Sequence, residues 1–411
     1  MLKIDKIQHT ELDGVVNLPG SKSIGNRYLL MKAVAGAELD FLNLPDSNDI
    51  LVFKRCLSSE TGDCFFEDAG TPLRFYLAYA ALRGNNERVI DGFERLRARP
   101  IKPLLEALES CGAVFKYLKE DYSLPLKVIQ TLDKDTRELT IPASISSQFV
   151  SALMLIAPYF NFGLTIRLRG EMRSAPYVDM TRALMDRNGV RCESGESTIK
   201  IGAGQYLFDT VEIESDWSAA AFFYSLMAVG RRGEILLKGL FRNSTQGDSE
   251  MVTIYNAFGI NSTFEEGGVR IRCEENCIEK VEIDIKDTPD MFPALCATLV
   301  SLRIPSVIKG VRNLRDKESD RVSAMAYNAK QMGAEFTMEG DDVLSIEFEA
   351  KPQDIIQVKA YGDHRIAMAC SVFALKSVVI IDTEEVVSKS FPAYWEAFNN
   401  LYGDFAKKVS E

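Results

Sequence analysis

The sequence of 411 residues is short of the residue types that build metal centres and disulfide frameworks. It has only two histidines, His9 and His364, so no metal site is expected. Its eight cysteines are scattered, and only Cys273 and Cys277 lie close together, which favours reduced, mostly structural thiols. No segment approaches 18 uninterrupted apolar residues, so we expect no membrane span. The hydrophobic content of 46% and the charged content of 26% are typical of a soluble globular protein.

Basic residues are also in deficit, since the formal net charge is −11. This balance argues against a nucleic-acid partner, although a few local cations could still bind a small anion. The N-terminal MLKIDKIQHTELDGVV has no apolar segment of the kind found in signal peptides, so a cytoplasmic location is expected. The length predicts roughly two domains. The acidic surface, with no obvious exposed apolar stripe, leads us to expect a monomer.

One sequence pattern occurs six times: a β-like run, a short polar turn and then a strongly apolar helix. The six copies are VVNLPGSKSIGNRYLL, CFFEDAGTPLRFYLAYAAL, LTIPASISSQFVSALMLIAP, VEIESDWSAAAFFYSLMAV, VEIDIKDTPDMFPALCATLV and IQVKAYGDHRIAMACSVFAL. The helices are apolar nearly all round, as at Phe149, Ile156, Phe222 and Met227, which predicts buried helices. Strand periods alternating with helix periods predict an α/β fold with three copies in each half. The break between the halves is expected near Glu214–Trp217.

A second pattern alternates with the first, in which a helix-period segment ends at a glycine and a β-like run follows. These glycines are Gly112, Gly189, Gly259 and Gly333. Glycine at such a position fits the left-handed backbone conformation that stops a helix before a strand.

The polar turns that open the six helices have two possible roles. Their Ser, Thr and Asp side chains could simply cap the helices. Alternatively, the unpaired N–H groups and the positive end of the helix dipole could bind a phosphate or carboxylate. The second role gains support from four cations at the turns that capping does not need, namely Lys22, Arg27, Arg74 and Arg365.

Nine short motifs, in their order along the chain, resemble the 3-phosphoshikimate 1-carboxyvinyltransferase (EPSP synthase) family. They are LPGSKSIGNR, DAGTPLR, RARPI, SISSQF, SAPYVDM, RNSTQGD, RDKESDR, YGDHRIAM and SKSFPAYW, and they extend from Leu18 to Tyr394 and just beyond. The resemblance implies two similar domains, each of three β-α-β-α-β-β units in an inside-out α/β barrel arrangement. The expected N-terminal lobe is 20–214, and the C-terminal lobe is 1–19 plus 215–411, with the active site in the cleft between them.

The resemblance implies transfer of the enolpyruvyl group from phosphoenolpyruvate to the 5-hydroxyl of shikimate 3-phosphate. No Walker A loop or dinucleotide fingerprint is present, and the reaction needs neither nucleotide nor metal, so no cofactor is expected. The two substrates bring roughly five to six negative charges. The matching motifs supply a comparable set of cations, namely Lys22, Arg27, Arg99, Lys317, Arg321, Arg365 and Lys389.

The same resemblance implies which residues bind each substrate. The expected shikimate 3-phosphate contacts are Lys22, Ser23, Arg27, Ser146, Ser147, Gln148, Ser174, Tyr177, Asp290, Asn313 and Lys317. The expected phosphoenolpyruvate contacts are Lys22, Gly70, Arg99, Gln148, Arg321, Arg365 and Lys389. Supporting parts fall to Thr71, His364 and Asp216, and for Asp216 helix capping is the first expectation.

The reaction itself requires two proton transfers, one at C3 of phosphoenolpyruvate and one at the sugar hydroxyl. We assign Glu318 to C3 and Asp290 to the 5-hydroxyl, with Lys22 assisting. The segment RDKESDRVSAMAYNAKQMG is expected to be one helix with Lys317 and Arg321 on its polar face. The alternative for this charged run is a solvated surface helix with ion pairs.

The chain departs from the family pattern at four places, where Gly25, Asp68, Phe75 and Met291 replace the usual residues. None removes an assigned charge, but they leave the shape of the phosphoenolpyruvate pocket and the response to glyphosate open. The nearest alternative function is UDP-N-acetylglucosamine enolpyruvyl transfer, for which neither Cys64 nor Cys111 is suitably placed to be the reactive cysteine. A non-catalytic anion-binding protein would need the cations but not Asp290 and Glu318.

Overall fold

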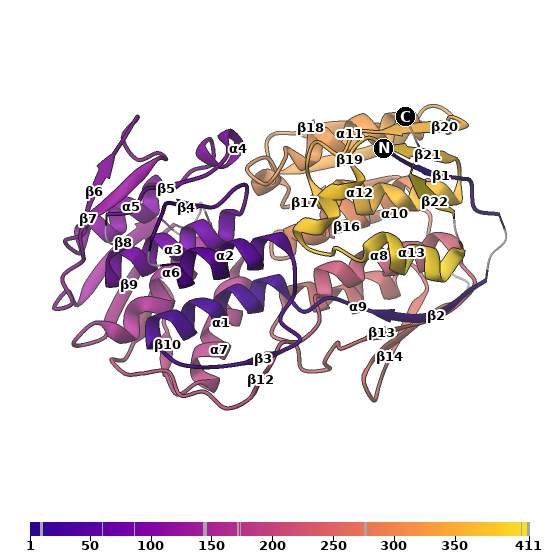
Figure 1. The fold of residues 1–411 in the computed structure, drawn as a ribbon. Helices are drawn as coiled ribbons and strands as arrows, with labels where there is room; N and C mark the ends of the chain where they lie inside the picture. Colours follow the sequence, from indigo (N-terminus) through magenta and orange to yellow (C-terminus); the bar gives the residue numbers. More distant parts are fainter. Residues whose placement is uncertain are drawn as a thin grey trace. The chain divides into compact units, whose positions relative to one another are not determined.

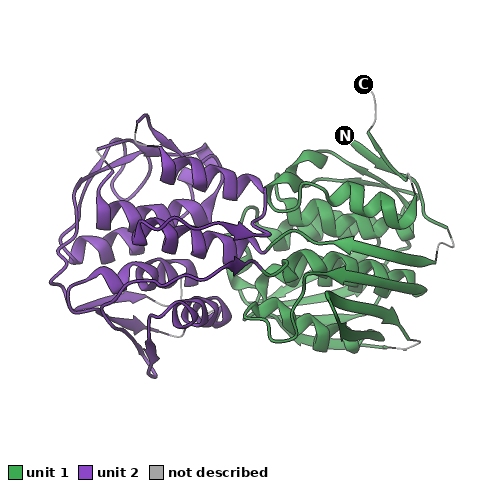
Figure 2. Cartoon of the chain, turned by 60° about the horizontal axis from the view of Figure 1, so that its bottom comes forward, with its two compact units in different colours: residues 1–20, 214–411 green, residues 21–213 purple. Residues whose placement is uncertain are grey.

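The computed structural model describes residues 1–8, 11–59, 61–85, 87–142, 146–170, 172, 174–274, 278–403 and 405–408. The chain folds into two compact units, each of helices and small sheets (Figures 1 and 2). Unit 1 comprises Met1–Gly20 with Glu214–Glu411, and unit 2 comprises Ser21–Ile213. The boundaries expected from the sequence between the two lobes fall between residues 19 and 20 and between residues 214 and 215.

The sheets of unit 1 repeat one pattern of strand pairing. In two of these sheets the first strand pairs in parallel with the second, and the two remaining strands add in antiparallel orientation, so that the last strand in sequence lies inside the sheet. In the third sheet a strand from the N-terminal segment takes that inner position. A helix follows the first strand and another follows the second. This is the β-α-β-α-β-β unit that the sequence predicts, and the fold class is confirmed.

Two of the unit 1 repeats are continuous between residues 281 and 408. One contains β16 (Val281–Asp284), η3 (Pro289–Met291), α10 (Phe292–Leu302), β17 (Ser306–Lys309), η4 (Arg312–Leu314), α11 (Arg321–Gln331), β18 (Ala334–Glu339) and β19 (Val343–Phe348). The other contains β20 (Ile355–Val358), α12 (His364–Cys370), η5 (Ser371–Leu375), β21 (Val378–Ile381), η6 (Glu384–Lys389), α13 (Tyr394–Tyr402) and β22 (Ala406–Lys408), and β1 (Leu2–Ile4) completes its sheet between β21 and β22.

The remaining unit 1 repeat takes its first strand from the N-terminal segment. It contains β2 (Leu12–Asn17), α8 (Trp217–Gly230), β13 (Gly233–Lys238), η2 (Gly247–Glu250), α9 (Met251–Asn256), β14 (Ile260–Glu265) and β15 (Gly268–Cys273). Strand β2 pairs in parallel with β13, from Leu12 opposite Gly233 to Asn17 opposite Lys238. The strand that directly precedes α8, β12 (Val211–Glu212), instead pairs with β3 (Phe41–Leu42) in unit 2. The two connecting segments have therefore exchanged their first strands.

Unit 2 holds two complete repeats and one reduced repeat. The complete ones are β4 (Cys64–Phe65), α3 (Gly70–Arg83), β5 (Ile90–Asp91), α4 (Glu94–Arg97), α5 (Lys102–Ser110), β6 (Val114–Tyr117) and β7 (Leu126–Gln130), then β8 (Glu138–Pro142), α6 (Ser147–Ile156), η1 (Ala157–Tyr159), β9 (Leu164–Arg169), α7 (Ala175–Arg187), β10 (Cys192–Ser194) and β11 (Thr198–Ile201). The reduced repeat has α1 (Lys22–Ala35) and α2 (Asn48–Ser58) beside the two-stranded β3–β12 sheet.

The helices that open each repeat form the centre of each unit's core, as their apolar sequences predict. In α8 every residue from Trp217 to Val229 is buried, and in α6 Phe149 and Ile156 are fully buried. Each unit has its own hydrophobic cluster, around α8, α10 and α12 in unit 1 and around α1, α3 and α6 in unit 2. Burying helices on all sides fixes their N-terminal ends in position, which matters because those ends carry the candidate site residues.

The four glycines expected to end helices all adopt positive φ angles, between +80° and +90°. Gly333 follows α11, and a Cβ at this position would collide with the backbone of Ala350. Gly340 has φ +67° in the turn between β18 and β19, but a Cβ there meets nothing within 4 Å. A substitution at Gly340 therefore introduces only the strain of a left-handed backbone, whereas one at Gly333 adds a steric collision to that strain.

We expect Gly333→Ala to lower the free energy of unfolding by about 2–4 kcal/mol, because it adds overpacking to backbone strain. Gly340→Ala, the control in the same unit, should cost only about 1 kcal/mol. Urea unfolding followed by tryptophan fluorescence measures both, since Trp217 and Trp395 lie in unit 1. Equal losses in the two variants would show that the Ala350 backbone yields without cost.

Candidate active site

The openings of the buried helices carry most of the sequence-predicted residues. Side chains cap four of them: Ser21 caps α1, Ser146 caps α6, Asp216 caps α8 and Asp363 caps α12. Asp216 Oδ1 accepts a hydrogen bond from Ala219 N at 3.2 Å, which confirms the capping role expected for it. Helices α3 and α10 begin without a side-chain cap. Capping thus accounts for several polar residues, but not for the cations beside them.

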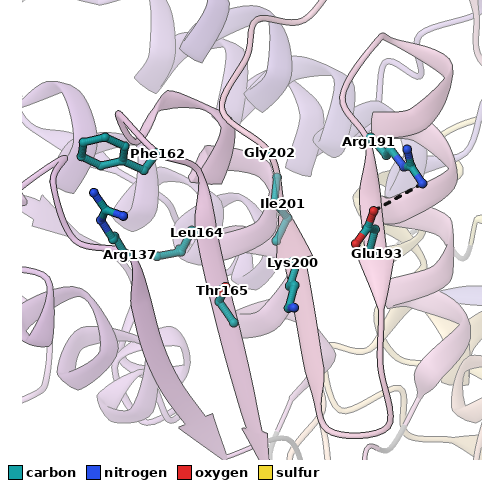
Figure 3. A pocket seen from close by; sticks show the side chains of 9 residues that line it. All are labelled: Arg137, Phe162, Leu164, Thr165, Arg191, Glu193, Lys200, Ile201 and Gly202. Carbon is teal, nitrogen blue, oxygen red and sulfur yellow. Dashed lines mark ion pairs between the residues drawn. The ribbon is translucent and has the colours of Figure 1, made fainter.

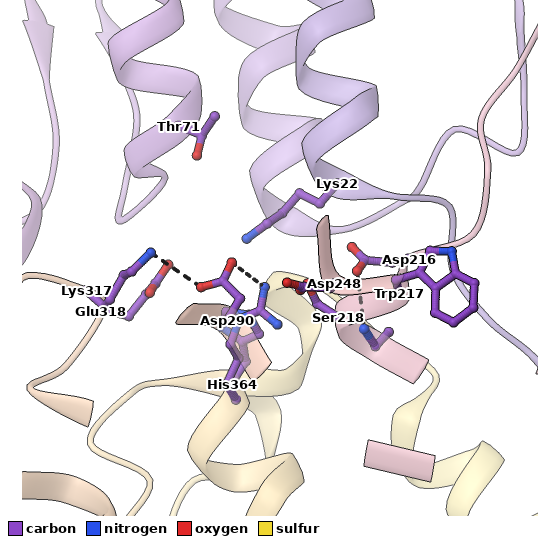
Figure 4. A network of polar contacts seen from close by, with 12 residues as sticks. Lys22, Thr71, Asp216, Trp217, Ser218, Asp248, Asp290, Lys317, Glu318 and His364 are labelled. Atoms are coloured by element: carbon purple, nitrogen blue, oxygen red, sulfur yellow. Dashed lines mark hydrogen bonds and ion pairs between the residues drawn. The ribbon is translucent and has the colours of Figure 1, made fainter. Parts of the chain in front are cut away.

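Within unit 1, Arg321 connects three carboxylates (Figure 4 labels two of them, Asp290 and Glu318). Its guanidinium donates to Asp290 Oδ1 at 2.8 Å, to Glu318 Oε2 at 2.9 Å and to Asp363 Oδ2 at 2.9 Å. The Arg321 side chain is only 1% exposed. The two carboxylates assigned to proton transfer are therefore held by one buried cation at the opening of α11.

Asp290 lies in η3, directly before α10, and collects two further cations. Arg365 Nη2 donates to its Oδ2 at 3.1 Å, and Lys317 Nζ lies 3.5 Å from its Oδ1. Burial alone would raise the pKa of the Asp290 carboxyl, but Arg365, Lys317 and Arg321 together hold it well below its usual range. Asp290 is therefore a carboxylate near neutral pH, in the state that accepts a proton.

Arg321 keeps its charge despite its burial. Desolvation opposes the charged form, but Asp363, Glu318 and Asp290 outweigh it and raise the pKa of the guanidinium above its ordinary value. Asp363 is fully buried and was not predicted from the sequence as a site residue. Its position directly before His364 and Arg365, at a strand-to-helix turn, is the signal that could have identified it.

The expected helix through Lys317 and Glu318 is wrong, because α11 begins only at Arg321. Asp320 caps it by accepting from Ser323 N at 3.1 Å, so Lys317 and Glu318 lie in the preceding turn. A turn allows Lys317, Glu318 and Arg321 to converge on Asp290, whereas a regular helix fixes their spacing along one face. The ion pair between Glu318 and Arg321 is not a solvated surface pair, since the Glu318 side chain is 13% and the Arg321 side chain 1% exposed.

Lys22 and Arg27 lie in α1 of unit 2. Lys22 Nζ forms an ion pair with Asp49 Oδ2 at 3.0 Å, and Asp49, from α2, is buried. Asp49 was missed by sequence reasoning because the segment DSNDI reads as a helix start. The guanidinium of Arg27 donates to Thr181 Oγ1 at 2.8 Å and to the carbonyl oxygen of Tyr177 at 2.9 Å. Burial lowers the pKa of Arg27 to about 10, partly offset by Tyr177.

A second cluster of unit 2 lies where α3 opens. Gln148 connects it, accepting from Arg74 Nη1 at 3.0 Å and donating to Thr71 Oγ1 at 2.9 Å. The guanidinium groups of Arg74 and Arg99 lie against the α3 backbone at Gly70. A Cβ at this position would lie 2.7 Å from Arg74 Nη1 and would collide with Arg99. The Nε of Arg99 is buried and has no hydrogen-bond partner among the described residues. A side chain at position 70 would therefore displace the guanidinium groups of Arg99 and Arg74.

The remaining predicted residues are placed as follows. In unit 2, Ser147 is buried, Ser23, Ser146 and Tyr177 are half-buried, and Ser174 is buried with φ +56°, an unusual value for a non-glycine residue directly before α7. In unit 1, Asn313 in η4 and Lys389 at the end of η6 are half-buried. His364 is fully buried, with Nδ1 3.7 Å from Asp363 Oδ1. His9 and Cys277 lie outside the described residues.

Three of the four departures from the family pattern have packing consequences. A side chain at Gly25 would crowd Ile50 and Leu44, each 3.1 Å from a Cβ at that position. Phe75 is fully buried, with its ring centroid 5.7 Å from the guanidinium carbon of Arg27. Met291 is fully buried beside Asp290 in the sequence. Asp68 is half-buried, and nothing in the structure explains its presence.

The described part of the chain also has a hollow away from these residues. A hollow of about 430 Å³ lies on the sheet of β8, β9, β10 and β11, lined by residues such as Arg137, Phe162 and Lys200, but none of the sequence-predicted residues lines it (Figure 3). No group of three or more His, Cys, Asp or Glu side chains that could hold a metal ion occurs in the described part of the chain. The described cysteines are free thiols, as the sequence predicts.

Comparisons with known proteins agree with the resemblance. The family model for EPSP synthase (3-phosphoshikimate 1-carboxyvinyltransferase) matches residues 55–398. A 3-phosphoshikimate 1-carboxyvinyltransferase of Bacteroides fragilis is 34% identical over 405 residues, covering 98% of each chain. One of Erwinia tasmaniensis is 34% identical over 421 residues, covering 95% of this chain and 96% of the relative.

Solved structures share the fold. The EPSP synthase of Acinetobacter baumannii gives a TM-score of 0.78 at 20% identity, covering 98% of each chain. The enolpyruvyl transferase NikO of Streptomyces tendae gives 0.74 at 14% identity, covering 100% of this chain and 99% of that one. At these sequence identities the solved structures show the fold alone, whereas the family model and the full-length relatives show the family. The chain belongs to the EPSP synthase family.

Proposed function

We propose that this protein transfers the enolpyruvyl group of phosphoenolpyruvate to the 5-hydroxyl of shikimate 3-phosphate. The products are 5-enolpyruvylshikimate 3-phosphate and phosphate, the reaction of EC 2.5.1.19 in chorismate and aromatic amino acid biosynthesis. The observation that carries the proposal is the pairing of Asp290 and Glu318 on Arg321, because this reaction needs two proton-transferring groups beside cations. The relatives bearing this activity's name match over nearly the whole chain.

We assign one set of residues to each substrate. For shikimate 3-phosphate we assign Lys22, Ser23, Arg27, Ser146, Ser147, Gln148, Ser174, Tyr177, Asp290, Asn313 and Lys317. For phosphoenolpyruvate we assign Lys22, Gly70, Arg99, Gln148, Arg321, Arg365 and Lys389, with Thr71, Asp216 and His364 supporting. Arg99, whose Nε lacks a hydrogen-bond partner among the described residues, is well suited to bind an anion.

The chemistry follows from the charge states. Protonation of C3 of phosphoenolpyruvate by Glu318 makes C2 electrophilic, and the 5-hydroxyl adds while Asp290 takes its proton. The tetrahedral ketal then collapses, phosphate leaves, and Glu318 takes a proton back from C3. Asp290 is ionised, as this part requires, because Arg365, Lys317 and Arg321 hold its pKa well below the usual range despite its burial. An ionised carboxylate can accept the proton as the 5-hydroxyl bonds to C2, because the hydroxyl becomes acidic at that stage.

Glu318 needs the opposite state, protonated at the start. Its Oε2 lies 2.9 Å from the Nη2 of Arg321, a cation that we also assign to phosphoenolpyruvate. A phosphate or carboxylate that binds Arg321 competes with Glu318 for the guanidinium. This competition gives substrate binding a direct route to the carboxyl group that we assign to C3.

The alternative activity, enolpyruvyl transfer to UDP-N-acetylglucosamine, would call for a reactive cysteine. Cys64 and Cys111 are almost completely buried. Burial raises the pKa of both thiols, that of Cys111 to about 11, so neither is a thiolate near neutral pH. A merely anion-binding protein has no use for the two carboxylates on Arg321. The buried thiols and the carboxylate pair both favour the shikimate reaction.

For the wider setting we infer a monomer that works in the cytoplasm, without cofactor, nucleic acid or membrane. None of the described helices is long and apolar enough to cross a membrane. The net charge of −11 disfavours a nucleic-acid partner.

Substrate choice tests the proposal. We expect phosphate release from phosphoenolpyruvate to require shikimate 3-phosphate and to ignore UDP-N-acetylglucosamine, since the site lacks an available thiolate. A coupled phosphate assay with each acceptor alone measures this. Release that depends on UDP-N-acetylglucosamine instead would overturn the assignment.

Glu318→Gln tests the proton-transfer role, because glutamine keeps the shape but cannot deliver a proton. We expect turnover to fall by roughly 10²-fold or more while both substrates still bind. Glu347→Gln, on the exposed face of β19, removes the same charge away from Arg321 and should leave turnover unchanged. Steady-state kinetics and titration calorimetry give the two quantities, and full turnover by Glu318→Gln would remove this residue from the mechanism.

A further inference from the structure

Asp248 is a buried carboxylate to which neither the sequence motifs nor the proposed mechanism gives a role. It lies in η2, at the end of RNSTQGD, and is 4% exposed. Its Oδ2 accepts a hydrogen bond from the hydroxyl of Ser218, in the first turn of α8. Its Oδ1 is buried without a hydrogen-bond partner in the described part of the chain. Among the described residues a single neutral donor therefore serves this carboxylate, through Oδ2 alone.

The charged groups around Asp248 come from three elements of unit 1 (Figure 4). Asp216 lies at the N-cap of α8, Asp290 in η3 and Arg365 in the first turn of α12. The two carboxylates disfavour a negative charge on Asp248, and Arg365 favours it. His364, the other titratable group on α12, lies beside Asp363, 3.7 Å from it.

Arg365 is already engaged by another carboxylate, since its Nη2 donates to Asp290 Oδ2 at 3.1 Å. The cations Arg321 and Lys317 also face Asp290. Three cations thus form ion pairs with Asp290. Asp248 accepts a hydrogen bond from one neutral hydroxyl, and the charge of Arg365 also favours its ionised form. Of two neighbouring buried carboxylates with such unequal support, the less supported one keeps its proton.

We propose that Asp248 is a proton-carrying positioning residue that acts on the reaction through Arg365. With its proton in place, Asp248 leaves the charge of Arg365 to Asp290 and the anionic substrate. When it loses the proton, a second buried carboxylate competes for the same guanidinium. The inference rests on the proposed function, in which Arg365 binds phosphoenolpyruvate.

The Asp248 carboxyl titrates within the pH range that kinetic experiments can cover. Burial and the charge of Asp290 raise the pKa of Asp248 to about 7, although the Ser218 hydrogen bond and Arg365 act in the opposite direction. Ionisation of Asp248 therefore weakens anion binding as the pH rises through 7.

The kinetic test compares the wild type with Asp248→Asn, which resembles the protonated carboxyl at every pH. We expect the ratio of kcat/KM for phosphoenolpyruvate, Asp248→Asn over wild type and normalised at pH 6, to rise about tenfold by pH 8.5, as one pKa unit of coupling implies. Substrate ionisation is common to both enzymes and cancels in the ratio. A ratio that stays flat with pH would overturn the proposal.

Ser218→Ala provides a second variant that keeps Asp248 itself. The Ser218 hydroxyl stabilises the ionised form, so its removal should move the decline of kcat/KM to higher pH. A purely structural defect would lower kcat/KM at every pH alike, and an unmoved decline contradicts the proposal.

Thermal unfolding tests the proton on Asp248 without any turnover. The unfolded pKa of aspartate is about 3.9, below the folded value, so ionisation costs stability as the pH rises from about 4 to about 7. We expect the Tm advantage of Asp248→Asn over the wild type to grow between pH 5 and pH 7 and to level off above. If the Tm advantage grows in this way but the protein shows no enolpyruvyl transfer, the proposed function is refuted and the proton on Asp248 is not. A constant Tm difference would refute the proton on Asp248.

Discussion

The site in unit 1 depends on one buried cation, the guanidinium of Arg321. Placing a charge out of contact with water is costly unless it is paired and hydrogen-bonded. Arg321 meets that condition with Asp290, Glu318 and Asp363, which come from η3, from the turn before α11 and from the opening of α12. The planar fork of arginine can bind several carboxylates in fixed directions, which a lysine ammonium cannot do. One residue thus connects three separate segments of the unit and orients both carboxylates to which we assign proton transfer.

The hydrophobic helices make this arrangement rigid. Because α8, α10 and α12 are buried on nearly all sides, their N-terminal ends are fixed in position. Asp216, Asp290 and Arg365 sit at those ends, where their backbone is well defined. Unit 2 follows the same rule with α1, α3 and α6, which carry Lys22, Gly70 and Ser147. The repeat supplies rigid helix openings, and individual side chains give each opening its chemistry.

Much of the fold was predictable because its signals are local. A glycine with positive φ ends a helix at Gly112, Gly189, Gly259 and Gly333, and the period of apolar residues identifies each buried helix. The exchange of β2 and β12 between the repeats was not predictable, since either strand could pair in parallel with β13 or β3 by pattern alone. Strand partners far apart in sequence leave no short-range signal.

The site was predictable in its residue types more than in its contacts. Motif resemblance identified Asp290, Glu318 and Arg321, but Asp363 and Asp49 were missed, because a buried aspartate before a helix looks like an ordinary cap. The helix expected through Lys317 failed for a related reason. The charge spacing fits a helix, yet Asp320 caps α11 three residues later, and only the tertiary ion pairs with Asp290 reveal why.

The guanidinium fork at position 321 orients the carboxylates of Asp290 and Glu318, and this role can be tested directly. Replacing it by Arg321→Lys keeps the positive charge but exchanges the rigid planar fork of donors for a compact ammonium on a flexible stem. Turnover by this variant, measured as phosphate released from phosphoenolpyruvate in the presence of shikimate 3-phosphate, is therefore the most direct measurement. We expect a loss of roughly 10²-fold or more at saturating substrate. Turnover close to that of the wild type would show that charge alone suffices, and would contradict the account.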